Sequence, residues 1–265
     1  MCGIGPHDVS VNELLTSARE CLIRERRRTL DELAAFETFE RRLRSIRPDT
    51  VSVTRGRSSV AAVSTASAEV LSGLDAVREA YETTVMDVSH YTEEYGDTYV
   101  QSIVDEFGSD IGAALIRGLV FDERCKRAVM DAVSTSQETR EALLGGLNTE
   151  RASLDEATDE LCPLVDEIRR LSRMRFRDES FGALDAYRAR LGVMQSRCDA
   201  LTARRQKTLR RQRRELRLSI GGLNLPSYLY QDLSVDFPVC SAIAELGGWI
   251  ESVRTNVERA MGHCS

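Results

Sequence analysis

The chain has 265 residues, a formal net charge of −6 and 42% hydrophobic residues. This length suits one large or two small domains, and the absence of any run of about 18 apolar residues predicts no membrane span. The N-terminal stretch MCGIGPHD lacks the charged and then apolar order of a secretory signal, so we expect a cytoplasmic protein.

Residues that usually build catalytic and metal sites are sparse. Seven cysteines are scattered without a CxxC pair, and His7, His90 and His263 are far apart, which predicts no metal site and free thiols in a reducing compartment. The chain contains no GxSxG, HExxH or phosphate-loop motif. We therefore predict no catalytic residue, no cofactor-binding residue and no enzymatic activity.

Long helices are predicted along most of the chain, after a segment at residues 1–9 that we expect to be disordered. Residues 10–47 are predicted to form the first helix, because Ser10 and Glu13 make a capping box and Pro48 stops the helix. Apolar residues recur there at alternating spacings of four and three with a polar middle, as in a coiled-coil seam. The seam runs through Val11, Leu15, Ala18, Leu22, Glu25, Thr29, Glu32, Phe36, Phe39, Leu43 and Ile46.

Residues 48–65 are rich in Ser, Thr, Val and Arg and are predicted to form a connector. A small helical cap is expected over residues 66–134, with a helix over residues 66–88 and a loop over residues 89–97. Thr98 with Gln101 predicts another helix start, Gly108 predicts its end, and Asp122 predicts the cap of a further helix.

A long antiparallel coiled-coil hairpin is predicted over residues 135–219, because Thr135 begins a second capping box and two more seams follow. The chain is expected to reverse near residues 178–179, which places Arg204 opposite about Ser153. The second seam runs through Leu143, Leu147, Glu150, Leu154, Ala157, Leu161, Leu164, Ile168 and Leu171, and the third through Leu184, Tyr187, Leu191, Met194, Cys198 and Leu201.

Residues 220–237 are predicted to form an aromatic loop, and residues 238–265 a C-terminal helix that begins at Pro238. The predicted fold is therefore all-α: the hairpin, the N- and C-terminal helices packed alongside it, and the small helical cap. Arms of this length carry more apolar seam than one thin bundle covers, so we expect self-association.

Basic residues dominate residues 204–217, where six of them fall within about 140° of helical arc. These six are Arg204, Lys207, Arg210, Arg211, Arg214 and Arg217. Across the predicted hairpin, the acids Glu150, Asp155 and Glu156 would neutralise this stripe and select the alignment of the arms. The alternatives are that the stripe binds a nucleic-acid backbone or an acidic protein partner.

Two groups of tyrosines have polar neighbours. One contains His90, Tyr91, Tyr95 and Asp97, and the other contains Tyr228, Tyr230 and Asp232. Tyrosines beside carboxylates can bind or polarise a ligand. In the alternative interpretation, their rings anchor loops at the end of a helical bundle and their hydroxyls form hydrogen bonds there.

Three segments resemble an uncharacterised family of haloarchaeal all-helical coiled-coil proteins. They are ARECLIRERRRTLDELAAFETFERRLRSI at residues 18–46, YETTVMDVSHYTEEYGDTYVQSIVDEFG at 81–108 and LPSYLYQDLSVDFPVCSAIAELG at 225–247. The resemblance implies a haloarchaeal, cytoplasmic origin and an all-helical fold, and no activity. Lys126 and Lys207 are the only lysines among 36 basic residues, a composition that also fits a GC-rich, salt-loving host.

These observations together predict a non-enzymatic helical scaffold or protein–protein interaction module that associates with itself or with another protein. The alternative is a nucleic-acid-associated protein that uses the stripe from Arg204 to Arg217. An enzyme built on the tyrosine groups is the third hypothesis.

Overall fold

The computed structural model describes residues 6–49, 72–219 and 223–263, and every regular element in these ranges is a helix. The predicted all-α fold is confirmed at this level. The expected disordered segment 1–9, the connector 48–65 and the start of the helix expected at residue 66 fall partly or wholly outside the described ranges. No helix within the described ranges has an apolar stretch long enough to cross a membrane.

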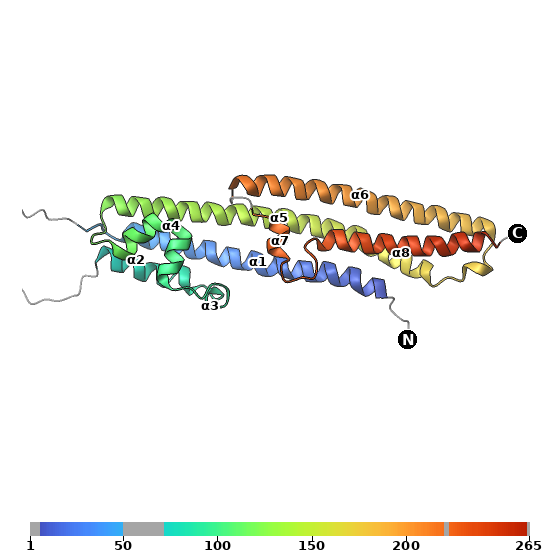
Figure 1. Ribbon diagram of the computed structural model, residues 1–265, viewed down its shortest axis with the longest axis horizontal. Coiled ribbons are helices and arrows are strands. Elements are labelled where there is room, and N and C mark those ends of the chain that lie inside the picture. The colour runs from blue at the N-terminus through green and yellow to red at the C-terminus, as the bar shows by residue number, and fades with distance from the viewer. Residues whose placement is uncertain (1–5, 50–71, 220–222, 264–265) are drawn as a thin grey trace, which may run out of the picture. The chain divides into compact units, whose positions relative to one another are not determined.

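The chain divides into two compact units. The first comprises Met1–Arg26 and Ala142–Ser265, and the second comprises Arg27–Glu141. Helices α1 (Pro6–Ser45) and α5 (Glu123–Ser172) each contribute residues to both units (Figure 1).

Two helix starts expected from capping boxes are wrong. Helix α1 begins at Pro6, so Ser10 lies inside it. Helix α5 begins at Glu123 and runs through Thr135 without interruption. Asp122 caps α5, as predicted, because its Oδ1 accepts a hydrogen bond of 2.7 Å from the backbone N–H of Cys125. The second seam continues N-terminally from Leu143 at the same spacings through Arg140, Ser136, Val133 and Val129. The last three are buried, and this continuous packed face favours one uninterrupted helix.

The first unit contains the second part of α5, the short helix η2 (Phe176–Asp178), α6 (Phe181–Ser219), α7 (Leu225–Leu229) and α8 (Pro238–Met261). Helix α8 packs along α6, as Figure 1 shows. Helix α7 lies inside the segment expected to be a loop. Its N-terminal residues Leu225 and Pro226 are buried, and Pro226 fits the first turn of a helix because it needs no N–H donor there.

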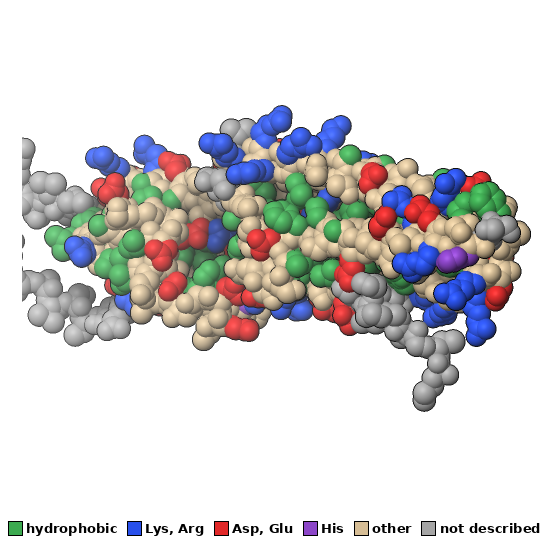
Figure 2. All heavy atoms as spheres, turned by 45° about the vertical axis from the view of Figure 1, so that its right-hand side comes forward, with side chains coloured by type: hydrophobic (Ala, Val, Ile, Leu, Met, Phe, Trp, Pro, Cys, Tyr) green, Lys and Arg blue, Asp and Glu red, His purple; other side chains and the backbone are tan. Residues whose placement is uncertain are grey.

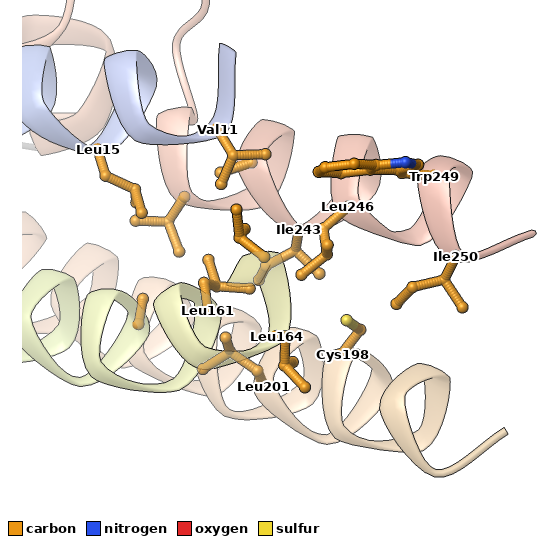
Figure 3. Close-up of a cluster of buried hydrophobic side chains, with 14 of the residues drawn as sticks. Val11, Leu15, Leu161, Leu164, Cys198, Leu201, Ile243, Leu246, Trp249 and Ile250 are labelled. Atoms are coloured by element: carbon orange, nitrogen blue, oxygen red, sulfur yellow. The ribbon is translucent and has the colours of Figure 1, made fainter. Parts of the chain in front are cut away.

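The core of the first unit collects side chains from four helices. Figure 3 shows Leu15 of α1, Leu161 of α5, Leu201 of α6 and Leu246 of α8 pointing toward one another. Each such side chain contributes about 1.5–3 kcal/mol when it is removed from water. The described seam residues are buried or half-buried within one chain. The expectation that the arms leave apolar seam uncovered is therefore wrong for these residues, and it no longer argues for self-association.

Helices α5 and α6 are antiparallel within the first unit, because their contacts descend along α5 as they ascend along α6. Arg190 pairs with Glu167, and Arg204 pairs with Glu156 at 2.9 Å. Farther along, the Gln212 side chain donates a hydrogen bond to the carbonyl of Gly146 at 3.4 Å.

The second unit contains α2 (Gly73–Glu82), η1 (Val85–Asp87), α3 (Tyr91–Glu94) and α4 (Tyr99–Arg117), together with parts of α1 and α5. Helix α2 ends at Glu82 rather than at Val88, and α3 lies inside the expected loop 89–97. Thr98 forms the predicted capping box with Gln101, and the predicted break at Gly108 is confirmed by its φ of 82°.

Aromatic rings make up much of the core of the second unit. The rings of Phe39 and Tyr81 meet edge to face at 5.3 Å between centroids, and those of Tyr81 and Phe107 at 5.7 Å. Such pairs stabilise a fold beyond the burial of their surface. Asp49 joins two backbone segments, because its carboxylate accepts hydrogen bonds from the N–H groups of Gly73 and Phe121.

Candidate functional site

Beyond Arg205, six basic side chains are exposed on α6, and we call them the basic face. They are Lys207, Arg210, Arg211, Arg213, Arg214 and Arg217. Figure 2 shows Lys and Arg side chains gathered at the upper edge of the view, over this part of α6. Helices concentrate charge in this way when residues three and four apart share a surface.

The facing acids do not neutralise the basic face. Of the six residues predicted to form the stripe, Arg204 alone pairs with acids of α5 in the described part of the chain, namely Glu156 and Glu160. Glu150 forms an ion pair with Arg205, and Asp155 forms ion pairs with Arg19 and Arg151. The predicted neutralisation is therefore wrong beyond Arg204.

The basic face forms one ion pair in the described part of the chain. Arg211 lies 4.0 Å from Glu215 on its own helix. No other member of the basic face forms an ion pair with a described acid. The remaining positive charge faces solvent, where it is available to a partner.

An apolar cleft of about 150 Å³ adjoins the basic face. Its lining includes Arg210, Arg213, the buried residue Gln212 and four apolar side chains. These four are Leu209, Leu225, Pro226 and Phe237, of which Phe237 is 39% exposed. Protein–protein interfaces commonly have an apolar centre surrounded by a polar rim, and Arg is enriched in them. The apolar cleft and its neighbouring arginines match this arrangement.

A buried ion pair lies on the inner side of α6, next to the basic face in sequence. The guanidinium of Arg205 donates two hydrogen bonds to the carboxylate of Glu150, at 2.6 and 2.8 Å. The same carboxylate accepts a hydrogen bond of 2.7 Å from the hydroxyl of Tyr230 and one of 3.2 Å from Gln212. Charges removed from water need such partners, so this cluster holds α5, α6 and the segment after α7 together.

The electrostatics of this cluster keep Glu150 charged. Burial by itself would raise the pKa of Glu150, but the hydrogen bonds and charge of Arg205, with those from Tyr230 and Gln212, outweigh it and lower the pKa. Burial and the neighbouring Glu150 charge raise the pKa of the Tyr230 phenol, which stays a neutral donor. The charged groups of the cluster pair with each other, as in a structural ion pair, while Arg205 Nε and Gln212 Oε1 are buried without a described hydrogen-bond partner.

The second predicted tyrosine group divides between several roles in the first unit. Tyr230 belongs to the buried cluster. The hydroxyl of Tyr228 donates a hydrogen bond of 2.6 Å to Glu25 of α1, and Asp232 is exposed. Tyr228 and Tyr230 therefore anchor α7 and its C-terminal end through hydroxyl hydrogen bonds, as in the alternative interpretation of this group, although the anchored segment is a helix. The described contacts do not gather the three residues into a ligand site.

The first predicted tyrosine group lines a cavity of about 280 Å³ in the second unit. Tyr91, Tyr95 and Asp97 face this cavity with residues of α1, α2, α4 and α5. His90 is buried beside it, and its Nε2 lies 3.1 Å from Glu32. The hydroxyl of Tyr95 donates a hydrogen bond of 2.8 Å to the same carboxylate.

Arg140 forms one wall of the cavity. Its guanidinium donates two hydrogen bonds to Glu106, at 2.7 and 3.0 Å, and one of 3.0 Å to Glu32. The guanidinium also lies over the ring of Phe36, 4.2 Å from the centroid. Burial would lower the pKa of Arg140, but Glu106 and Glu32 outweigh it, and the pKa is raised.

The amino-acid sequence from residue 13 to residue 254 matches the model of a family described as a domain of unknown function, DUF7260. The chain belongs to this family. No curated protein and no solved structure matches the chain. The family description names no activity, ligand or partner, so the function is inferred from the geometry of the two sites. In the described ranges no three His, Cys, Asp or Glu side chains are arranged to hold a metal ion.

The residues that sequence reasoning missed occupy seam positions. Continuing the third seam by four, three and four residues from Leu201 reaches Arg205, Thr208 and Gln212, of which the first and last are buried. Continuing the second seam three residues back from Leu143 reaches Arg140. A basic residue at a seam position must find a buried acid, and the seam residues Glu150 and Glu32 are those acids.

Proposed function

We propose that this protein is a non-enzymatic helical interaction module whose basic face binds an acidic surface of a partner protein. The observation that carries the proposal is the exposure of Lys207, Arg210, Arg213, Arg214 and Arg217 without an ion pair to a described acid. The remainder of the chain is acidic, since the net charge is −6 with these residues included. A localised positive area on an acidic protein steers association with acidic partners.

The neighbouring cleft supports a protein partner over a nucleic acid. An apolar side chain seated among Leu209, Leu225 and Phe237 would add binding that salt does not screen, whereas phosphate contacts weaken steeply with salt. The slope on duplex DNA is about −0.9 in log affinity per neutralised phosphate. We keep nucleic-acid binding as the second candidate, because six exposed cations follow one helix.

The proposed setting is the cytoplasm of a haloarchaeal host. The resemblance of three segments to haloarchaeal proteins and the near absence of lysine support this origin. In such a cell, exposed charges are strongly screened, so the affinity for the partner rests on contacts that combine Arg charge with apolar burial.

The proposed architecture of the module is an antiparallel coiled-coil hairpin of residues 135–219. The antiparallel contacts of α5 and α6 within the first unit support it, as does the burial of seam residues on both helices. The buried pair of Glu150 and Arg205 supports one alignment of these helices, because a shift of either by one turn would leave both charges unpaired. A fixed alignment of α5 and α6 would hold the side chains of the basic face at defined positions for a partner.

The test uses affinity-tagged full-length protein expressed in the native host and recovered at the salt concentration of its cytoplasm. The variant of the basic face is Arg210→Glu/Arg211→Glu/Arg214→Glu. The matched control is Arg173→Glu/Arg175→Glu/Arg177→Glu, which makes the same charge change at three exposed residues near the turn before α6. Both variants are checked for helix content before use.

We expect acidic proteins to co-purify with the natural chain and with the control, resistant to nuclease, and to be lost from the basic-face variant. A second copy of this chain would be one such partner, and light scattering identifies it. Recovery of nucleic acid at host salt, lost in the same variant, would favour the second candidate. Equal recovery with all three proteins would refute the role of the basic face.

A further inference from the structure

The cavity of the second unit has an excess of negative charge. Four carboxylates line it, and Arg140 is the one basic residue among its described lining residues. Two of the carboxylates, Glu32 and Glu106, are bonded to Arg140. The other two, Asp97 and Asp105, form no ion pair with a described residue. The cavity therefore carries negative charge that its own wall does not compensate.

A buried hydroxyl in this cavity has no partner. Tyr91 is 7% exposed and lines the cavity, and no described residue forms a hydrogen bond with its hydroxyl. The neighbouring hydroxyl of Ser102 lies close enough to lower the pKa of Tyr91, but its hydrogen bond of 2.9 Å is with the hydroxyl of Tyr81. Buried hydroxyl groups are ordinarily satisfied, so an unpaired one that faces a cavity marks a place for a ligand.

The surroundings hold the Tyr91 phenol in its neutral form. Burial raises the pKa of this phenol, the Ser102 hydroxyl opposes part of that increase, and the charges of Asp97, Asp105 and Glu106 add to it. A neutral phenol keeps its oxygen lone pairs available as acceptors. Asp97 and Asp105 are the lining carboxylates without an ion pair to a described residue, and they line the same cavity as the Tyr91 hydroxyl.

We propose that this cavity binds a small organic amine in its protonated, primary ammonium form. The ammonium would donate hydrogen bonds to the Tyr91 oxygen and to the carboxylates of Asp97 and Asp105. The rings of Tyr91 and Tyr95, whose centroids are 5.5 Å apart, offer faces that attract a cation. The side chains of Val85 and Val88 line the same cavity and would contact the apolar body of the amine.

Two properties of the cavity narrow the ligand class. Its volume of about 280 Å³ is at the lower end for small-molecule sites, which favours an amine with a short alkyl or single-ring body. The carboxylates are not arranged as a metal site within the described residues, which favours an organic cation over a metal ion. This inference concerns the second unit and does not depend on the partner proposed for the basic face.

Binding is tested on the full-length protein with n-butylamine and phenethylamine as probes, by isothermal titration calorimetry and ligand-observed NMR. The ligand 3-phenylpropionate is the charge-reversed control, with nearly the same body as phenethylamine. The variants are Tyr91→Phe, which keeps the ring, and Asp105→Asn. Their matched controls are Tyr99→Phe, which removes a buried unpaired hydroxyl that is not in the cavity lining, and Asp110→Asn, an exposed acid outside it.

We expect at least one amine to bind and 3-phenylpropionate not to bind. Tyr91→Phe should weaken amine binding about tenfold, the effect of losing one hydrogen bond to a charged group, and Asp105→Asn should also weaken it. Both control variants should bind the amines as the natural chain does. The proposal is overturned if neither amine binds, if the carboxylate binds equally well, or if Tyr91→Phe and Asp105→Asn leave amine affinity unchanged.

Discussion

Glu150 and Arg205 form a bidentate ion pair whose side chains are 0% and 1% exposed. They lie at seam positions of α5 and α6, where most other residues are apolar. Arg204, the neighbour of Arg205, pairs with Glu156 at the surface with 44% of its side chain exposed. Two adjacent arginines on one helix therefore form ion pairs in different environments, one buried and one exposed to solvent. Their removal should change the free energy of unfolding by different amounts.

Replacing Arg205 with Ala should lower the free energy of unfolding by about 3–5 kcal/mol, because it leaves Glu150 charged and buried without its partner. Arg204→Ala should lower it by less than about 1 kcal/mol, because an exposed pair is screened by water. Guanidinium chloride unfolding followed by circular dichroism measures both. Equal losses in the two variants would contradict the assignment of Arg205 to the core.

Stability should also depend on pH through Glu150. Its pKa is lowered in the folded protein from the ordinary value of 4.5, so its contribution is complete above that value and disappears as the pH falls through the folded pKa. Glu150→Gln lacks this titration. The stability difference between the natural chain and Glu150→Gln should be constant near neutral pH and shrink below about pH 4.5. A difference that stays constant into the acid range would be inconsistent with a lowered pKa.

Removal of the Tyr99 hydroxyl and removal of the Tyr230 hydroxyl should change the free energy of unfolding in opposite directions. The Tyr99 hydroxyl is buried without a described partner, so Tyr99→Phe should raise the free energy of unfolding by about 1 kcal/mol. The Tyr230 hydroxyl donates to Glu150, so Tyr230→Phe should lower it by about 1.5–3 kcal/mol. Thermal and chemical unfolding of the two variants give the signs, and a loss of stability in Tyr99→Phe would show that its hydroxyl has a partner.

The alignment of α5 and α6 can be tested by crosslinking, because the chain has only Lys126 and Lys207 as lysines. A lysine introduced at Thr149 should be joined to Lys207 within one chain by a short amine-reactive crosslinker, detected by mass spectrometry of peptides. Asp166→Lys is the control, since it lies roughly 17 residues, on the order of 26 Å, farther along α5 than Thr149. Crosslinking of Lys207 to position 166 and not to position 149 would exclude this alignment.

Much of the local structure follows from short-range chemistry, and the sequence predicts it. The capping box of Thr98 and Gln101, the break at Gly108 and the cap at Asp122 involve neighbours in sequence, so no tertiary contact is needed to anticipate them. The start expected at Thr135 failed because a longer buried face carries the helix through a local cap, and the start expected at Ser10 failed because α1 already begins at Pro6. A capping residue favours the start of a helix at its own position, whereas packing of the preceding residues favours a longer helix. Where the helix begins therefore depends on its tertiary contacts.

From the sequence alone, helical periodicity predicted an all-α chain, the residues that face the seams, and the polar residues Glu25, Glu32 and Glu150 at core positions. Only the tertiary structure decided their partners, because Arg205 lies 55 residues from Glu150 and Arg140 lies 108 residues from Glu32. Helix periodicity gives the direction of a side chain from its own helix axis and contains no information about which helix lies opposite. For the same reason the sequence grouped Tyr91, Tyr95 and Asp97, but the cavity that they line exists only where α1, α4 and α5 add Glu32, Asp105 and Arg140 to them.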